Sequence, residues 1–449
     1  MNEDIFQGYK GKSLEILKKY NAHVWDDAEI ETISGKFSGK ILPRAENTDS
    51  VHIVLKLPTG YNLGINIHNI TSIKSTKVAQ PNLKIEKKKT PYTQGLPKVK
   101  LLGTGGTIAS RLDYRTGAVV PAFSPDELYS AVPELANICN LETEKVFAVF
   151  SENMGHKQYI ALAHKIEEEV KKGVDGIVIA HGTDTLHHTS AALTFMCQNL
   201  PVPVVLVGSQ RSSDRPSSEA ALNLMHATTA AGKGNIAEVL VCMLATTSDT
   251  YGYLHKGTRV RKMHSSRRQT FRTIDDTPVA TVTVDGVRPI KENYQVRRTD
   301  KQMKIIPTFD DRVSILYFYP GMKPDILDSL VDKGYKGIIW MGAGMGHINK
   351  EMYEAVERAH KAGIHQYMTL QTIWGHSNML VYDSGRDAMA KGIIPCENML
   401  SEVAFVKLSW ALGQTQDPEE VKKIMLTPIN DEITLREPYN GFLVQQGEE

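Results

Sequence analysis

The sequence predicts an α/β protein with a small β-rich domain in front of it. From Val99 onward, short apolar, β-branched runs alternate with amphipathic helical patterns. That alternation is typical of doubly wound parallel sheets, which carry helices on both faces. Before residue 76, by contrast, the apolar runs are short, alternate with polar residues and are separated by turn residues. At 449 residues the chain is long enough for two or three domains with cores of their own.

We predict four segments. Residues 1–75 form the β-rich domain, a small barrel-like or meandering sheet with a helix near residues 13–20. Residues 76–97 are polar, lysine-rich and interrupted by prolines, which suits a linker. Residues 98–300 form a first α/β domain that carries the active site, and residues 301–449 form a second.

The strands expected in the first α/β domain lie within 99–103, 144–150, 173–182, 202–209 and 237–244, and the helices within 156–173 and 217–232. In the second domain we expect strands within 313–320, 335–344 and 364–372, followed by a long helix within 398–414. In such sheets the ligand site forms at the loops that follow the carboxyl ends of the strands.

Composition and charge exclude several classes of protein. Hydrophobic residues make up 41% and charged residues 23%, which is ordinary for a globular protein, and the net charge of +1 provides no long-range attraction to nucleic acid. The four cysteines form no CxxC pair, which favours free thiols in a reducing compartment. There is no basic leader followed by an apolar stretch, and no apolar run approaches the roughly 18 residues of a membrane span. We therefore expect a cytoplasmic protein that does not bind membranes.

A glycine-rich turn, Gly103-Thr104-Gly105-Gly106-Thr107, follows the first strand of the α/β region. A Walker-type phosphate loop would need a Lys after its last glycine, and a dinucleotide fingerprint would need a glycine where Ile108 stands. Neither cofactor interpretation fits. Taken alone, the turn is better explained by a tight bend whose threonines cap the next helix.

A second hydroxyl-rich turn, residues 181–185 (HGTDT), also lies between a strand and a helix. Both turns therefore fall where an open α/β sheet places its site. A hydroxyl becomes a good nucleophile only when a neighbouring base takes its proton, and Lys262 in the basic stretch 255–272 is a candidate base. A lysine serves as a base when burial or cationic neighbours lower its pKa. Cationic side chains in this stretch could do so, although we expect most of them to face solvent: Arg259, Arg261, Arg267 and Arg268.

With both turns in view, residues 99–418 resemble the bacterial-type L-asparaginase and glutaminase family, including its two-domain α/β fold. The motifs that carry the resemblance are TGGTIA at 104–109, HGTDT at 181–185, VFSENM at 149–154, VGSQRSSDRPSSEAALNL at 207–224, the Lys262 region, and GQTQDPEE at 413–420. The reaction that the resemblance implies is hydrolysis of a side-chain amide through an acyl-enzyme, with release of ammonia.

The resemblance also implies roles for individual residues. Thr107 is the expected primary nucleophile. Thr183, Asp184 and Lys262 are the expected second triad: Lys262 takes the proton from Thr183, and Asp184 either orients Lys262 or binds the α-amino group of the substrate.

The expected substrate contacts come from two other segments and from the backbone of the two turns. Ser151 and Glu152 would hold the α-carboxylate and α-amino ends, and Tyr114 matches the tyrosine of a mobile loop beside the nucleophile. The backbone N–H groups of the two turns, at Gly106 and Gly182, are natural oxyanion donors.

Two departures from plain asparaginases stand out. Met345 and His347 replace the asparagines of the family's GxGNGN turn, and the glutamate that a neighbouring subunit supplies has no clear counterpart. One subgroup accounts for these departures and for the N-terminal β-domain: the D subunits of archaeal glutamyl-tRNA(Gln) amidotransferases. That resemblance implies a glutaminase that delivers ammonia to a partner E subunit, which converts Glu-tRNA(Gln) to Gln-tRNA(Gln).

Partners and cofactors follow from the same resemblance. We expect two copies of each subunit, tRNA contacts mainly through the partner, no cofactor in this chain, and ATP and Mg used by the partner. The alternatives are a stand-alone L-asparaginase and a non-catalytic module that senses an amide. The presence of Thr107, Thr183, Asp184 and Lys262 together argues against the module, which needs no general base.

Other features have simpler interpretations. His187 and His188 lack a matching acidic ligand pattern, so we expect packing or helix-surface roles and no metal. The basic stretch 256–272 could contact tRNA or could be a solvated loop that also positions Lys262, because Phe271 is its only aromatic residue. The apolar helix near the C-terminus is expected to pack in the core or in a dimer.

Overall fold

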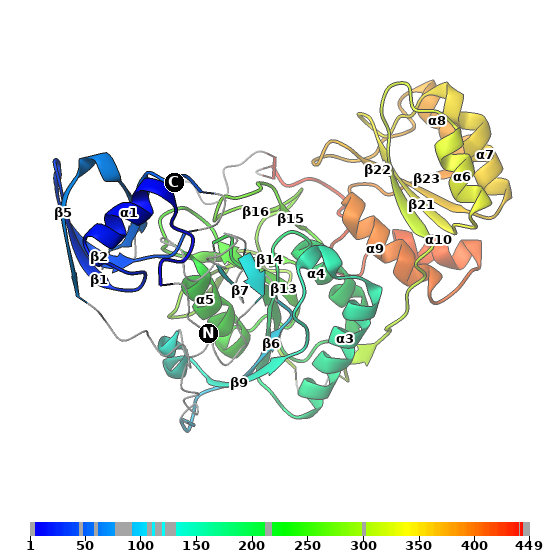
Figure 1. Ribbon diagram of the computed structural model, residues 1–449. Helices are drawn as coiled ribbons and strands as arrows, with labels where there is room; N and C mark the ends of the chain where they lie inside the picture. The colour runs from blue at the N-terminus through cyan, green and yellow to red at the C-terminus, as the bar shows by residue number, and fades with distance from the viewer. Residues whose placement is uncertain are drawn as a thin grey trace.

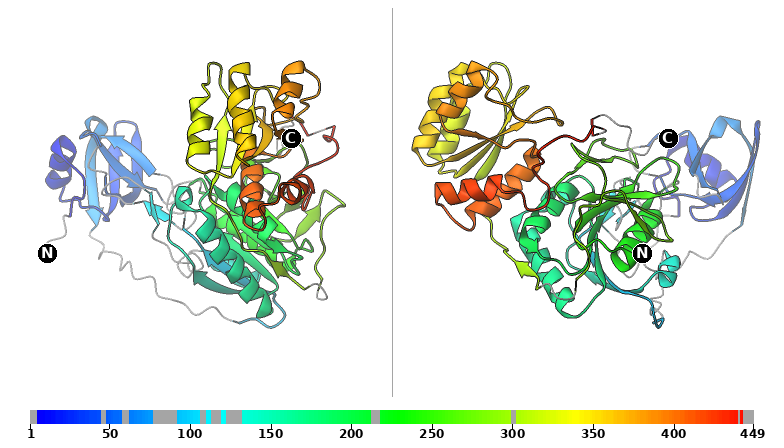
Figure 2. Two further views of the ribbon diagram at one scale, coloured as in Figure 1. Left: turned by 90° about the vertical axis from the view of Figure 1, so that its right-hand side faces the viewer. Right: turned by 180° about the vertical axis from the view of Figure 1, so that it is seen from behind.

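The structure is a computed structural model that describes residues 5–44, 48–57, 62–76, 92–105, 110–112, 119–121, 132–211, 218–298, 302–439 and 441–442. Figures 1 and 2 show a small β-rich domain, a large central α/β unit, and a second α/β unit beside it. Most of the predicted linker, 77–91, and the predicted boundary at residues 300 and 301 lie outside the described residues.

The N-terminal domain is an antiparallel sheet with one helix against it. Its elements are α1 (Gly11–Lys19), β1 (Asp27–Thr32), β2 (Gly35–Ile41), β3 (His52–Lys56), β4 (Asn62–Asn66), the 3-10 turn η1 (Ile67–Asn69) and β5 (Ile70–Thr76). Every second side chain of β1 is buried, among them Ala28 and Ile30, as expected for a sheet with one face on a core. Leu17 of α1 packs into the same core.

The order of this sheet, β4-β3-β2-β1-β5, corrects the barrel-like prediction. Strands β1 to β4 form the meander that was the other interpretation, whereas β5 crosses over to pair with β1 at the opposite edge. Within the described part of the domain, no ladder joins β4 to β5, so the sheet stays open.

The central unit is built on a mixed sheet, eight-stranded over the described residues, in the order β18-β17-β14-β13-β12-β10-β6-β9. The parallel strands are β6 (Lys98–Gly103), β9 (Asn140–Lys145), β10 (Gly176–Ala180), β12 (Val204–Val207) and β13 (Val239–Leu244). The antiparallel strands, which the sequence did not predict, are β14 (Gly252–Lys256), β17 (Ala280–Val282) and β18 (Val287–Pro289).

Helices cover both faces of this sheet: α3 (His156–Lys171) and α4 (Leu186–Met196) lie on one face, and α5 (Ala220–Lys233) on the other. Alternate residues of β10 divide between the two cores, with Ile177 and Ile179 facing α3 and α4, and Val178 and Ala180 facing α5. A strand buried on both faces reads as a continuous apolar run, which is why the sequence predicted it.

The second α/β unit has a four-stranded parallel sheet in its described residues, in the order β20-β21-β22-β23. Its elements are β20 (Val313–Tyr317), α6 (Asp325–Asp332), β21 (Gly337–Gly342), η5 (Lys350–Met352), α7 (Tyr353–Lys361), β22 (His365–Leu370), α8 (Asp383–Ala390), β23 (Ile393–Pro395), α9 (Ser401–Leu412) and α10 (Pro418–Leu426). Pro418 at the first position of α10 and the Asp417 carboxylate that caps two N–H groups explain its start.

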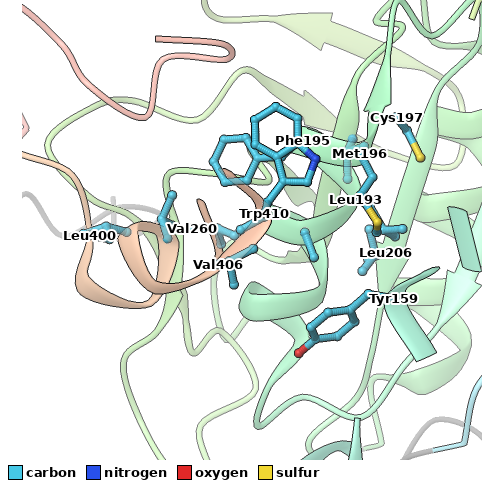
Figure 3. Close-up of a cluster of buried hydrophobic side chains, with 14 of the residues drawn as sticks. Tyr159, Leu193, Phe195, Met196, Cys197, Leu206, Val260, Leu400, Val406 and Trp410 are labelled. Atoms are coloured by element: carbon cyan, nitrogen blue, oxygen red, sulfur yellow. The ribbon is translucent and has the colours of Figure 1, made fainter. Parts of the chain in front are cut away.

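Helix α9 joins the two α/β units. Figure 1 shows it between α4 and the β21–β22 sheet, and Figure 3 shows its Trp410 beside Phe195 of α4. The Phe195 and Trp410 rings stack with centroids 5.8 Å apart. The apolar C-terminal helix is therefore a core element, as one of its two interpretations predicted.

Short elements complete the described chain: β7 (Ser110–Leu112), β8 (Val119–Pro121), η3 (Pro133–Asn137), η4 (Ser151–Asn153), β11 (Cys197–Gln198), β15 (Val260–Lys262), β16 (Phe271–Thr273) and β19 (Lys304–Ile305). The four cysteines are all free and buried. None of the helices in the described ranges is long and apolar enough to span a membrane.

Candidate active site

The two hydroxyl-rich turns begin side by side. Strands β6 and β10 are parallel neighbours, and their register places Gly103 opposite Ala180, the last residue before His181. The backbone N–H and the hydroxyl of Thr104 each donate a hydrogen bond to the Ala180 carbonyl at 3.0 Å. The carboxyl edge of the sheet thus joins the first turn to the second, as the sequence predicted.

A third segment, residues 146–151, closes against the first turn. The strand predicted at 144–150 is wrong in its position, because the ladder with β6 ends at Lys145 and the chain then bends over the turn. The N–H of Val149 donates to the Thr104 carbonyl at 3.1 Å. Gly105 has φ of +112°, and a Cβ there would lie 2.3 Å from the Val149 carbonyl oxygen. Only glycine permits this approach.

Lys262 meets Thr183 and Asp184 as predicted. The Lys262 Nζ atom donates hydrogen bonds to the Thr183 Oγ1 at 2.9 Å and to the Asp184 Oδ1 at 2.6 Å. The lysine side chain is 10% exposed and the Asp184 side chain 70% exposed, while Thr183 is buried. The buried Thr183 hydroxyl therefore contacts the Lys262 amine, and the other partner of that amine, Asp184, is exposed to solvent. This arrangement is suited to proton transfer.

Two buried contacts hold Thr183 in place. A Cβ on Gly208 would lie 2.7 Å from the Thr183 Cγ2, so the start of the 208–211 loop packs directly against the threonine. The His181 Nδ1 atom lies 2.7 Å from the Gly182 carbonyl oxygen, which can only accept, so this nitrogen carries the proton. The His181 Nε2 atom then accepts from the Thr189 hydroxyl at 2.9 Å. The turn is thereby fastened to α4.

The remaining predicted residues are placed as follows. Ser151 is buried, and its carbonyl oxygen accepts a hydrogen bond from the Thr185 hydroxyl at 2.5 Å, which ties its segment to the second turn. Gly182 lies in that turn, and Glu152 is exposed beside Ser151. Three predicted residues lie outside the described part of the chain: Gly106, Thr107 and Tyr114.

The basic stretch around Lys262 is a hairpin, and most of its arginines are not free in solvent. The expectation of solvent exposure is wrong for Arg259, which is fully buried. Arg261 forms an ion pair with Glu402, Arg268 forms one with Asp249, and Arg267 alone of the four is exposed. The partners of these arginines are distant in the sequence, so no local sequence pattern predicted them.

Burial keeps the histidines near the site neutral. It lowers the pKa of His181 to about 4, against the hydrogen bond to the Gly182 carbonyl, and the pKa of His188 to about 4, with Arg261 acting in the same direction. Burial also lowers the pKa of His187, helped by the neighbouring cations. Among the described residues, no group of three or more His, Cys, Asp or Glu side chains is placed to hold a metal ion.

Comparison with protein families covers nearly the whole chain. Residues 98–295 match the N-terminal domain of asparaginases, residues 312–425 match the glutaminase/asparaginase C-terminal domain, and residues 22–75 match the GatD N-terminal domain. The chain belongs to the asparaginase family and, within it, to the branch of glutamyl-tRNA(Gln) amidotransferase D subunits.

Individual relatives support this placement. The chain is 44% identical over 428 residues to the D subunit of the glutamyl-tRNA(Gln) amidotransferase from Methanothermobacter thermautotrophicus, covering 95% of this chain and 98% of the relative. It is 45% identical over 439 residues to the D subunit of the same enzyme from Thermococcus kodakarensis, covering 96% and 99%.

Solved structures cover the α/β part. The thermostable L-asparaginase from Thermococcus kodakarensis is similar with a TM-score of 0.67 and 33% identity, over 75% of this chain and 99% of that one. L-asparaginase I from Vibrio cholerae is similar with a TM-score of 0.66 and 25% identity, over 76% and 100%.

Proposed function

We propose that this chain is the glutaminase subunit of a tRNA-dependent amidotransferase that converts Glu-tRNA(Gln) to Gln-tRNA(Gln). The observation that carries the proposal is the Lys262 amine in contact with the Thr183 hydroxyl, at the edge where both hydroxyl-rich turns begin. The relatives named as amidotransferase D subunits, which this chain matches over nearly its whole length, support the amidotransferase setting. Glutamine is the proposed substrate, with asparagine as a second amide.

The proposed chemistry runs through two threonines. Thr107 follows Gly105 by two residues in the sequence, and the β6–β10 register places Gly103, which starts this glycine-rich segment, opposite Ala180. Its hydroxyl oxygen attacks the side-chain amide carbon while its proton passes through Thr183 to Lys262; the C–N bond then breaks, and the departing nitrogen takes that proton and leaves as ammonia. Water then attacks the acyl-enzyme, releasing glutamate and restoring the Thr107 hydroxyl. In its neutral form, Lys262 takes a proton from Thr183, and Asp184 orients Lys262 or binds the α-amino group.

Substrate binding is assigned to the segments around this pair. Ser151 and Glu152 are proposed to hold the α-carboxylate and α-amino ends, and Tyr114 is proposed to close beside the nucleophile. The N–H groups of Gly106 and Gly182 are proposed to stabilise the oxyanion. The 2.5 Å hydrogen bond from Thr185 to Ser151 supports this division, since it couples the second turn to the substrate-binding segment.

The proposed assembly has two copies of this chain and two of an E subunit, in the cytoplasm. The E subunit binds most of the tRNA and uses ATP with Mg, and this chain supplies ammonia and uses no cofactor. The N-terminal domain, residues 22–75, supports this assembly because it matches a domain named for GatD.

The test is an ammonia assay with the purified chain, with and without an E subunit and Glu-tRNA(Gln). We expect slow glutamine hydrolysis by the chain alone and faster hydrolysis in the complete mixture, together with Gln-tRNA(Gln). Thr107→Ala should abolish ammonia release in both. Undiminished release from that variant would contradict the assigned nucleophile.

A stand-alone L-asparaginase is the second candidate, favoured by the likeness of the α/β part to L-asparaginases. The two functions differ in their dependence on the partner. Rapid turnover of free asparagine by the isolated chain, unaffected by the E subunit and tRNA, would favour the second candidate.

A further inference from the structure

The side chains of residues 259–262 contact both α/β units. Arg259 donates from Nε to the Asp431 carbonyl at 2.7 Å and from Nη1 to the Asn398 carbonyl at 2.8 Å, both in the C-terminal unit. Arg261, two residues further on, donates from Nη1 to the Glu402 Oε2 at 3.0 Å, also in that unit.

Lys262 turns the other way, to Thr183 and Asp184 of the central unit. Consecutive side chains of a strand point to opposite sides, so Arg261 and Lys262 of β15 hold the strand from both sides. Any shift of Arg261 along or across the strand is therefore passed to its neighbour, Lys262.

The ladder that carries Lys262 is short. Among the described residues, strand β15 pairs with β16 alone, over three residues: Val260 with Thr273, Arg261 with Arg272, and Lys262 with Phe271. An isolated two-stranded hairpin is marginally stable in water, so the position of this one depends on the side chains that anchor it. Buried Val260 and Phe271 provide apolar anchoring, and Figure 3 shows Val260 beside Leu400 and Val406 of the C-terminal unit.

Glu402 is itself held firmly. It lies in the first turn of α9, where the helix dipole favours a carboxylate, and it is 4% exposed. The preceding residue, Ser401, exchanges a 2.8 Å hydrogen bond with Thr369 of β22. Burial raises the pKa of Glu402, and the Arg261 guanidinium opposes that shift by favouring the charged form. The charged form of the Glu402 carboxylate is thus stabilised by Arg261, and the Arg261 side chain is held in place by that carboxylate.

We propose that Glu402, acting through Arg261, is a positioning residue that ties the Lys262 base to the C-terminal α/β unit. This inference rests on the proposed function for the role of Lys262. Helix α9 also packs on α4, which starts directly after the Thr183–Thr185 turn, so one helix supports both partners of the 2.9 Å contact. Loss of the Glu402 carboxylate leaves Thr183 in place and frees the strand that carries Lys262.

The test compares Glu402→Gln, Arg261→Gln and the double variant in the full-length chain, assayed with glutamine under the conditions in which the wild type is active. Each single variant should lower kcat about tenfold, because an error of about 1 Å in a catalytic group costs up to about a hundredfold, and KM should stay the same. The double variant should be no worse than either single one. Arg261→Lys, which keeps the charge, should recover most of the lost kcat.

The matched control is Arg268→Gln, which removes a paired arginine from the same hairpin and should leave kcat unchanged. A second readout needs no substrate: the rate at which an N-hydroxysuccinimide ester acylates Lys262, followed by mass spectrometry. We expect faster labelling in Glu402→Gln and Arg261→Gln, and wild-type labelling in Arg268→Gln.

Unchanged kcat in Glu402→Gln, additive losses in the double variant, or unchanged labelling of Lys262 would each overturn the proposal. A wild-type chain that hydrolyses no amide would instead contradict the proposed function, and the labelling experiment would still decide whether Glu402 positions Lys262.

Discussion

Two lysines of this chain meet a carboxylate at the same distance, in regions that differ in the exposure of that carboxylate and in the other partners of the lysine. The Lys262 Nζ lies 2.6 Å from the Asp184 Oδ1, and the Lys407 Nζ lies 2.6 Å from the Glu432 Oε1. Lys407 and Glu432 are fully buried, whereas the Asp184 side chain is 70% exposed.

The two lysines differ in how many of their N–H donors have hydrogen-bond partners. Lys407 also donates to the carbonyls of Met425 and Thr427 at 3.0 and 2.8 Å, which accounts for all three of its N–H donors. Its ammonium lies 5.7 Å from the centre of the Phe195 ring. Lys262 has a hydroxyl, Thr183, as its second partner. The buried Lys407–Glu432 pair, whose N–H donors all have partners, has a structural role. Lys262 contacts the Thr183 hydroxyl beside a solvent-exposed carboxylate and can exchange a proton there.

The largest expected effect is on activity at the open pair. Lys262→Ala should lower the rate of glutamine hydrolysis about a thousandfold, since a general base contributes about 10² to 10⁴ in rate. Its urea unfolding midpoint should stay close to that of the wild type, because exposed Asp184 is left in water. Lys323→Ala, which removes a surface lysine paired with Glu351, is the control for both measurements. Full activity of Lys262→Ala would remove the distinction between the two lysines.

The buried pair should show the opposite pattern. Glu432→Ala leaves the Lys407 charge buried and frees the N–H groups of Ile429 and Asn430, so we expect it to lower the free energy of unfolding by about 3–5 kcal/mol. Urea titration followed by circular dichroism measures this loss, with Glu351→Ala as the surface control. A loss as small as that of the control would mean that the pair contributes nothing to the fold.

A smaller effect is expected from Gly208→Ala. The added Cβ would lie 2.7 Å from the Thr183 Cγ2 and 2.9 Å from the His181 carbonyl oxygen, so the turn that carries Thr183 must shift. We expect kcat to fall about tenfold or more, because catalytic groups tolerate little displacement. Gly286→Ala meets no heavy atom within 4 Å and is the matched control. Equal kcat values for the two variants would argue against a tightly held Thr183.

The smallest expected effect is a pH dependence of stability at Asp275, another buried carboxyl group. Burial and a hydrogen bond with Glu437 raise its pKa from 3.8 to about 7, against the Gly375 N–H and the Arg259 charge. The folded chain therefore keeps a proton that the unfolded chain loses, so stability should fall as pH rises from about 4 to about 7.

Asp275→Asn should remove this slope without straining the backbone, because asparagine tolerates the positive φ of 51° at this position. Unfolding midpoints measured across this pH range test the expectation, with the exposed turn residue Asp285→Asn as control. An unchanged slope in Asp275→Asn would show that the carboxyl group does not titrate as proposed.

Much of the site could be predicted from the sequence, for a physical reason. Continuous apolar runs such as 176–180 identify parallel strands, and parallel neighbours bring the turns after them to one edge, so Gly103 and His181 had to lie close together. By chemistry Lys262 was one candidate base, and the family resemblance selected it. The strand predicted at 144–150 was wrong because the same apolar residues cover the glycine turn instead of extending the ladder.

The sequence by itself determined most of the parallel strands, the helices between them and the two hydroxyl-rich turns, because each depends on residues close together in the chain. The tertiary structure alone decided that Arg259 is buried, that Arg261 meets Glu402, and that Gly208 supports Thr183. These contacts join residues far apart in the chain. Burial and pairing between such residues produce no periodic pattern in the sequence from which they could be predicted. Local sequence therefore determined the open edge, and packing between segments distant in the chain, within and between the two α/β units, determined the contacts that hold it in place.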